Sequence, residues 1–279
     1  MLCKDERIMY ICEIKTERRY ITITTSKGWR YFKIEVDSIK KLAFDEVSGK
    51  LIVELKNEEV IEIQPQTMDD RDTISSLLVL LTIAPDPAIL DITGKVLKPF
   101  SRATAVLVKL VLTLYEGSYA NWKKLSEISD ELAGIVKSSR ELWGGVVEGE
   151  VNYLLELISQ RDAKRLVASL KNITVSIYES AKLSLAKILP GSSSESLLDL
   201  ALALVLNSTM KSLNISLPEK EVASLEDIAL STLKRFSKIF NVDSALLKDL
   251  ESFLSSTSSP EEFVDKVVEV LKNSLKPIT

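Results

Sequence analysis

The residues best suited to chemistry in this sequence form a cluster of cations and aromatic rings between positions 15 and 33. The cluster consists of Lys15, Arg18, Arg19, Tyr20, Lys27, Trp29, Arg30, Tyr31 and Lys33, with Glu17 as its single acid. Cations attract phosphate groups, and exposed rings stack on bases or insert at a lipid interface. The cluster therefore predicts a site for a phosphate-bearing ligand, either a nucleic acid or a lipid headgroup. The alternative is a solvated hairpin, or a face that the rest of the chain covers, because such residues are ordinary on strands.

A second set of candidates consists of carboxylates. They are Glu127, Asp130, Glu131, Glu148, Glu150 and Glu156. Glu127 and Asp130 lie one helical turn apart, and facing helices that carry such pairs can hold Mg²⁺. A second matched E-x-x-D pair is missing, however, and no glycine-rich loop that would cradle a phosphate is present. We therefore expect glutamates that face water, and keep a metal-dependent all-α carboxylate hydrolase as an alternative.

Missing residue types exclude many reactions. The chain has no histidine, which removes Ser-His-Asp and Cys-His catalysis, haem ligation through histidine and mixed Cys/His zinc sites. Its two cysteines, Cys3 and Cys12, are too few for a four-ligand zinc site or a disulfide framework, and Cys12 is expected to be a small buried hydrophobe. Serine-rich stretches at 192–194 and 255–259 have no base beside them and are expected to be linkers. We expect no enzyme, no cofactor and no bound metal.

The composition indicates a globular protein. Hydrophobic residues make up 46% of the 279, and the net charge of −4 means that a polyanion would need a local basic patch. The longest apolar runs, 77–84 and 200–206, are far shorter than the roughly 20 residues of a membrane span. The first residues lack the apolar stretch of a signal peptide. We therefore expect a cytoplasmic protein without a transmembrane span, and scarce glutamine favours a thermophile.

A sheet must position the basic–aromatic cluster, because apolar residues alternate with period two through the first 66 residues. The pattern predicts six antiparallel strands, three on each side of a link at Asp37–Ile39. Four turns predict registers in which apolar residues share the inner face. The predicted pairs are Cys12 with Ile21, Ile23 with Phe32, Phe44 with Val53, and Val53 with Ile63. The inner face should also hold Ile8, Tyr10 and Ile14, and the outer face Tyr20, Trp29 and Tyr31.

One amphipathic helix should close this module. Thr67 is its predicted N-cap, and aspartates at 69, 70 and 72 suit the positive end of the helix dipole. The predicted apolar stripe consists of Ile74, Leu77, Leu78 and Leu81. The Pro-Asp-Pro sequence at 85–87 ends the helix and predicts the domain boundary.

The order of these elements resembles the pleckstrin-homology-like superfold, a small bent antiparallel sheet closed by one C-terminal helix. The stretch Ile34–Leu81 carries the resemblance, through Asp37–Leu42, Lys50–Leu55 and the capped helix. It covers under a third of the chain, with six predicted strands where the superfold usually has seven. The resemblance implies a module that binds lipid headgroups, peptides or proteins, with the basic residues at 15, 18 and 19 in the loop that carries the cations of phosphoinositide-binding members. A six-stranded barrel of another kind is the alternative.

The rest of the sequence predicts helices almost throughout. We expect them at 101–115, 121–142, 151–157, 163–189, 195–213 and 224–240, then after caps at Asp243 and Ser259, with breaks at 143–145 and 190–194. Segment Leu197–Leu206 is apolar nearly all round, which indicates a helix central in a bundle, or one buried in an oligomer or a partner's groove. The predicted fold class is therefore α+β with two domains: a β module with its closing helix at 1–84, a linker at 85–100 and an all-α bundle at 101–279.

These observations favour a non-enzymatic binding or scaffold protein. The β module would be its recognition head, and the helical domain would bind a protein partner or form a homo-oligomer. The alternatives are binding of nucleic acid or anionic lipid through residues 15–33, and the metal-dependent hydrolase.

Overall fold

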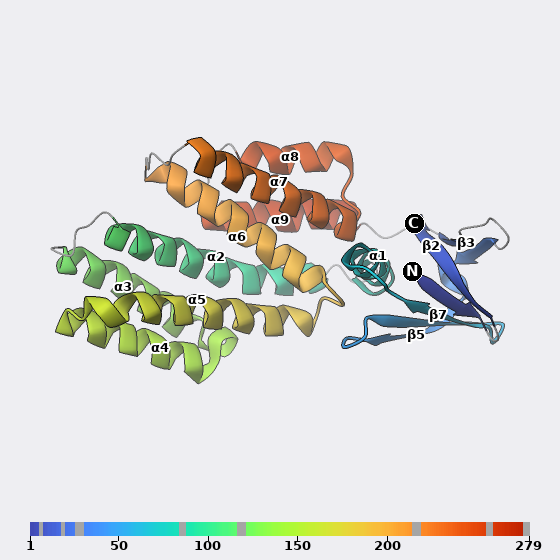
Figure 1. Ribbon diagram of the computed structural model, residues 1–279, viewed down its shortest axis with the longest axis horizontal. Helices are drawn as coiled ribbons and strands as arrows, with labels where there is room; N and C mark the ends of the chain where they lie inside the picture. The colour runs from blue at the N-terminus through green and yellow to red at the C-terminus, as the bar shows by residue number, and fades with distance from the viewer. Residues whose placement is uncertain are drawn as a thin grey trace.

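The computed structural model describes residues 1–5, 8–17, 20–25, 31–83, 88–115, 121–213, 219–254 and 259–275. A curled antiparallel sheet forms one end of the molecule and a long group of helices forms the rest (Figure 1). Helix α1 (Met68–Leu78) lies between the two. The two-domain α+β layout expected from the sequence is confirmed.

Within the described residues the sheet has seven strands, one more than predicted, in the order β4-β3-β2-β1-β7-β6-β5. The strands are β1 (Leu2–Asp5), β2 (Ile8–Glu17), β3 (Tyr20–Thr25), β4 (Tyr31–Glu35), β5 (Ile39–Asp45), β6 (Lys50–Leu55) and β7 (Val60–Gln64). The missed strand, β1, pairs with β2 on one side and β7 on the other, so it joins the two predicted halves. Its four residues are too few for a recognisable alternation, and pairing with both neighbours defines it.

The predicted register is correct for the hairpin of β3 and β4, where Ile23 lies opposite Phe32. The other three predicted registers are wrong, by four residues between β2 and β3 and by two residues in each of the other two pairs. The observed pairs are Cys12 with Thr25, Phe44 with Leu51, and Val53 with Ile61. Two of the turns explain the shift: β2 runs on to Glu17, and β5 and β6 are joined by residues 46–49. A shift by an even number of residues leaves each side chain on its face, so the inner face is still apolar, although Ile8 is 49% exposed.

Cys12 is buried as expected, but it forms a disulfide with Cys3, and the expectation of an unpaired cysteine is wrong. The Cα atoms of the two cysteines are 5.8 Å apart. Strand β1 brings Cys3 beside β2, and the sequence pattern did not show β1. A count of two cysteines excludes a disulfide framework, but it does not exclude one bridge.

The closing helix α1 begins as predicted. The Thr67 hydroxyl accepts from the Asp70 N–H, and the Asp70 carboxylate accepts from the Thr67 N–H, which completes a capping box. Ile74, Leu77 and Leu78 pack into the core of the β module. In the following π-helical turn η2 (Val79–Ile83), Val79, Leu80 and Ile83 pack into the core of the helical domain, whereas Leu81 packs against the core of the β module. One continuous segment therefore belongs to both cores.

The helical domain is built around α2 (Ala88–Tyr115), which packs against α3, α5, α6 and α9. The helices after α2 are α3 (Trp122–Ser138), α4 (Arg140–Gln160), α5 (Ala163–Ala186), α6 (Ser193–Ser212), α7 (Glu219–Phe240), α8 (Ser244–Leu254) and α9 (Pro260–Ser274). Helix α2 begins inside the predicted linker 85–100 and contains Pro99, because burial of Leu90, Leu97 and Phe100 offsets the cost of a proline. The predicted break at 143–145 is a local kink of α4 at Gly144, whose φ is +67°.

Among the described residues, no single helix has both the length and the apolar character to cross a membrane. The segments Met68–Ile83 and Ala88–Leu114 reach the required length and apolar character only when taken together, and the bend between them is 120°.

Candidate functional site at the domain junction

The predicted ligand cluster on the hairpin is described in part. Lys15, Tyr20 and Lys33 are described with their side chains, and Tyr31 by its backbone in β4. Predicted binding residues Arg18, Arg19, Lys27, Trp29 and Arg30 lie outside the described residues. The exposed side chains of Lys15 and Lys33 flank Thr22 from the two neighbouring strands, on the outer face of the sheet. The Lys33 Nζ lies 3.9 Å from the centroid of the Tyr20 ring, a cation–π contact.

The predicted carboxylates are not brought together. Across the described ranges, no three acids or cysteines gather where they could hold a metal ion. Glu127 pairs with Lys123 on its own helix, and Glu148 pairs with Arg140. Glu127 and Glu148 therefore serve as surface partners for nearby cations.

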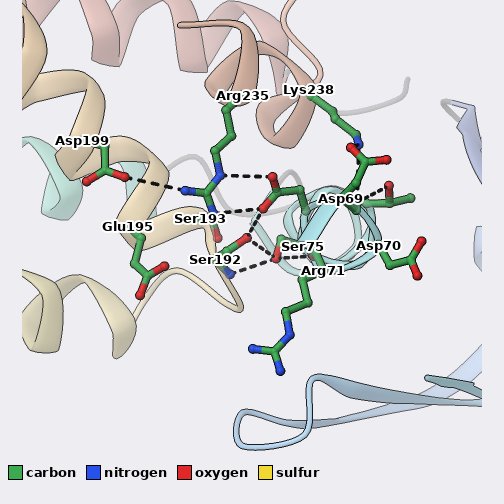
Figure 2. A network of polar contacts seen from close by, with 12 residues as sticks. Asp69, Asp70, Arg71, Ser75, Ser192, Ser193, Glu195, Asp199, Arg235 and Lys238 are labelled. Atoms are coloured by element: carbon green, nitrogen blue, oxygen red, sulfur yellow. Dashed lines mark hydrogen bonds and ion pairs between the residues drawn. The ribbon is translucent and has the colours of Figure 1, made fainter. Parts of the chain in front are cut away.

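A buried ion pair joins the two domains instead. Asp72 of α1 is only 8% exposed, and both of its carboxylate oxygens accept from Arg235 of α7, each at 3.0 Å. This bidentate geometry is the strong form of an arginine–carboxylate contact. Figure 2 shows Arg235 reaching from the helical domain to α1. Hydrogen bonding to Asp72 raises the pKa of Arg235 above its ordinary value, so the guanidinium is permanently charged.

Arg235 also connects this pair to the interior of the bundle. Its Nη1 lies 3.6 Å from Asp199 Oδ2 on α6, and Asp199 Oδ1 accepts a hydrogen bond of 2.8 Å from the Tyr178 hydroxyl on α5. Burial, and then the hydrogen bond to Asp199, raise the pKa of Tyr178, so its hydroxyl is a donor at neutral pH. The polar network thus crosses α1, α7, α6 and α5.

Two serines continue the network across the junction. The Ser192 hydroxyl, just before α6, donates to Asp72 Oδ1 at 2.9 Å. The Ser192 N–H donates to the Ser75 hydroxyl at 2.8 Å, and the two hydroxyl oxygens are 2.9 Å apart. Because the Ser192 hydroxyl is used on Asp72, it does not cap its own helix. These serines connect the domains, and the expectation that residues 192–194 are only a linker is wrong.

Gly191 allows this close approach. Its φ is +61°, and a Cβ added there would lie 2.5 Å from the Ser75 hydroxyl oxygen. A left-handed φ and this clash both disfavour a side chain. The break at 190–194, predicted from a proline, a glycine and three serines, is therefore a specific turn that docks on α1.

Two further ion pairs lie beside the network. Lys238 of α7 pairs with Asp69 of α1, which gives these two helices a second ion pair (Figure 2). Lys182 of α5 lies 2.6 Å from Glu195 of α6, and this hydrogen bond raises the pKa of Lys182. Nearly every charge at the junction thus has a partner among the described residues.

The network does not resemble a catalytic arrangement. Ser192 is hydrogen-bonded to a carboxylate, as a nucleophile would be to a base, but the guanidinium of Arg235 neutralises that carboxylate through both oxygens. A carboxylate held in this way anchors the Ser192 hydroxyl by a hydrogen bond. The arrangement is that of a rigid joint.

The sequence pattern missed this joint because Asp72 also suits the first turns of a helix, where its charge would favour the dipole. A signal was nevertheless present. Asp72, Ser75 and Ser76 follow one face of α1 at helical spacing, directly beside the apolar stripe. A polar face next to a buried stripe predicts a second packing surface, but Arg235 is too distant in sequence to be identified as its partner.

No family model, curated protein or solved structure matches this chain.

Proposed function

We propose that the protein is a non-catalytic binding protein, with the β module as its recognition head and the helical domain as a rigid body. The observation that carries the proposal is an apolar patch on the outer face of β2. Met9 and Ile11 on this face are 65% and 60% exposed, and Leu2 of β1 lies directly opposite Ile11. Large exposed apolar side chains that lie together commonly mark a protein-binding surface.

The charges around the patch support this proposal. On the same outer face, Glu62 pairs with Lys4 and Lys50, and Glu54 pairs with Lys40. Charged side chains that pair with each other and face water need no binding partner. The apolar side chains of the β2 patch, in contrast, leave water only when another molecule covers them. The joint between α1 and α7 would hold the patch at a constant orientation to the helical body, as a scaffold requires.

The test compares two double variants of the full chain. Met9→Thr with Ile11→Thr removes the patch and keeps β propensity, and Val167→Thr with Val175→Thr removes two exposed apolar residues of α5. Crosslinking and quantitative mass spectrometry of captured proteins should show partners lost with the β2 variant and kept with the α5 variant. Sedimentation would reveal a second copy as the partner. The same capture profile from both variants and the original chain would contradict the proposal.

A second candidate function is binding of a phosphate-bearing ligand at the hairpin. Lys15 and Lys33 on both sides of Thr22, and Lys33 over the Tyr20 ring, support it. This function also follows from the resemblance to pleckstrin-homology-like modules. Single-stranded RNA and anionic vesicles are the probes, each titrated with NaCl. Binding should weaken as salt rises and in a variant with Arg18, Arg19, Arg30 and Lys33 changed to glutamate. Binding that resists both changes would exclude this function.

We also propose that the protein works in the cytoplasm. The disulfide between Cys3 and Cys12 is unusual there, except in hyperthermophiles, whose intracellular proteins often contain disulfides. The composition favours a thermophile.

A further inference from the structure

A small pocket opens at the junction, beside the polar network. Its cavity volume is about 130 Å³. Its apolar lining consists of Phe44 of β5 with Met68 and the buried Ile74 of α1, and the lining also includes Gly191 and Ser192 of the turn that precedes α6. The pocket therefore offers an apolar surface next to hydrogen-bonding groups, as small-molecule sites generally do.

Arg71 supplies the charge of this pocket. In the described part of the chain, Arg235, Lys238 and Lys182 each have a carboxylate partner at the junction, whereas no ion pair joins Arg71 to an acid. Figure 2 shows its guanidinium pointing away from the network and toward the sheet. A guanidinium that lines a pocket and lacks an acid partner is suited to hold a planar anion through two hydrogen bonds.

Two glutamates limit the charge that the pocket accepts. Glu46 and Glu195 also line it, and Glu195 is neutralised in part by Lys182 at 2.6 Å. A doubly charged phosphate would be repelled about twice as strongly by these acids as a singly charged carboxylate. The apolar lining favours a ligand that carries a compact hydrocarbon group, which would cover Met68, now 60% exposed.

We propose that this pocket binds a monocarboxylate with a compact apolar group, with the carboxylate on Arg71 and the apolar group on Phe44 and Met68. Such a group occurs at the C-terminus of a peptide and in a free aliphatic acid. The site is distinct from the β2 patch. A negative result at this pocket therefore leaves the proposed function intact, and a negative result at the β2 patch leaves the pocket proposal intact.

Methionine methyl groups provide a direct readout in the full chain. Met68 lines the pocket, whereas Met9 lies on the outer face of β2 and Met210 in the last turns of α6. With ¹³C-methyl methionine, titration of 4-methylpentanoate or N-acetyl-leucine should shift the Met68 signal in a saturable manner and leave Met9 and Met210 in place. The uncharged 4-methylpentan-1-ol and inorganic phosphate should bind at least about tenfold more weakly, because they lack the charge or carry too much of it.

Comparison of the two acids identifies the source. Tighter binding of N-acetyl-leucine indicates a peptide C-terminus, and equal or tighter binding of 4-methylpentanoate indicates a free acid. Either outcome supports the site. No saturable Met68 shift, equal binding of the alcohol, or tighter binding of phosphate would overturn it.

Substitutions test the role of each charge. Arg71→Gln should weaken binding of the acids by about tenfold or more, because a charged hydrogen bond is lost. Glu46→Gln should tighten binding by up to about fivefold, because it removes a repulsion at the exposed rim. Arg165→Gln, at the far end of α5, is the matched control and should change nothing. If Arg71→Gln binds as the original chain does, or if Glu46→Gln weakens binding, the proposed orientation is wrong.

Discussion

Single residues decide how the two domains meet. Gly191 lets the turn before α6 approach α1, Ser192 reaches Asp72 and Ser75, and Arg235 holds Asp72 with two hydrogen bonds. Each residue has an ordinary explanation in the sequence, as a helix breaker, a loop serine or a surface arginine. Their importance arises from one buried carboxylate, because a buried charge is tolerated only where partners satisfy it.

Gly191→Ala tests the close approach at the junction. The added Cβ would lie 2.5 Å from the Ser75 hydroxyl oxygen in a backbone conformation with φ of +61°. We expect a loss of about 1–3 kcal/mol in the free energy of unfolding, measured by urea titration, because strain and steric overlap act together. Gly145→Ala is the control, since nothing lies within 4 Å of its added Cβ. Equal urea midpoints for the Gly191 variant and the original chain would show that the turn does not pack closely against Ser75.

At the scale of elements, α1 and β1 have roles that their own sequences do not reveal. Helix α1 begins with a capping box and buries the predicted stripe, but its other face and η2 extend into the helical domain. Strand β1 has four residues and joins the two halves of the sheet. Both elements connect parts of the fold, and connection depends on neighbours that are distant in the chain.

Asp70 links the stability of α1 to pH. Burial raises the pKa of Asp70, but hydrogen bonds from the Gln66 and Thr67 N–H groups and from the N-terminal ammonium outweigh it, so the pKa falls below 3.8. Its stabilising contribution is therefore complete above pH 3.8 and disappears as the pH falls through the folded-state pKa. Asp70→Ala should cost about 1 kcal/mol at pH 7, as loss of a cap does, and less as the pH falls below 3.8.

Urea titrations at pH 7, 5 and 3 measure this difference. Asp130→Ala, on an exposed turn of α3, is the control and should change the free energy of unfolding little at any of the three pH values. A cost for Asp70→Ala that is constant with pH would show that the charge of Asp70 does not stabilise the helix.

The disulfide holds β1 in the sheet. Cys3 and Cys12 are almost completely buried, and nine positions separate them in the chain. Loop closure of this length should contribute about 2–3 kcal/mol, so reduction should lower the free energy of unfolding by that amount. A thiol assay in guanidinium should detect no thiol without reductant and two after reduction. Two thiols in the untreated chain would contradict the bridge.

At the scale of the whole molecule, the polar network makes the two domains one unit. The pairs of Asp72 with Arg235 and of Asp69 with Lys238 both join α1 to α7, and η2 is buried in the helical core. A head attached through a flexible linker would move independently of the body. A head attached through a shared helix and a buried ion pair should unfold together with it.

Arg235→Met tests this coupling. It leaves Asp72 buried without its main partner, and we expect a loss of roughly 2–4 kcal/mol, since breaking a buried pair costs about 3–5 kcal/mol and Arg235 is 26% exposed. Hydrogen exchange during urea unfolding should show one transition for the original chain and two for the variant, with the β module opening first. Lys272→Met, which breaks an exposed pair with Asp91, is the control. One shared transition in both variants would show that the pair of Asp72 with Arg235 is not needed to couple the domains.

The local pattern of the sequence determined which residues face inward, where α1 begins and that a β module precedes a helical region. Alternation with period two distinguishes the faces of a strand, and the cap at Thr67 depends on residues three positions away. The same period leaves registers that differ by an even number of residues equivalent, so three of four pairings needed the assembled sheet. The tertiary structure also decided that Cys3 meets Cys12 and that Asp72 meets Arg235. The first contact depends on β1, which the sequence pattern does not show, and the second depends on α7, which is distant from α1 in the sequence.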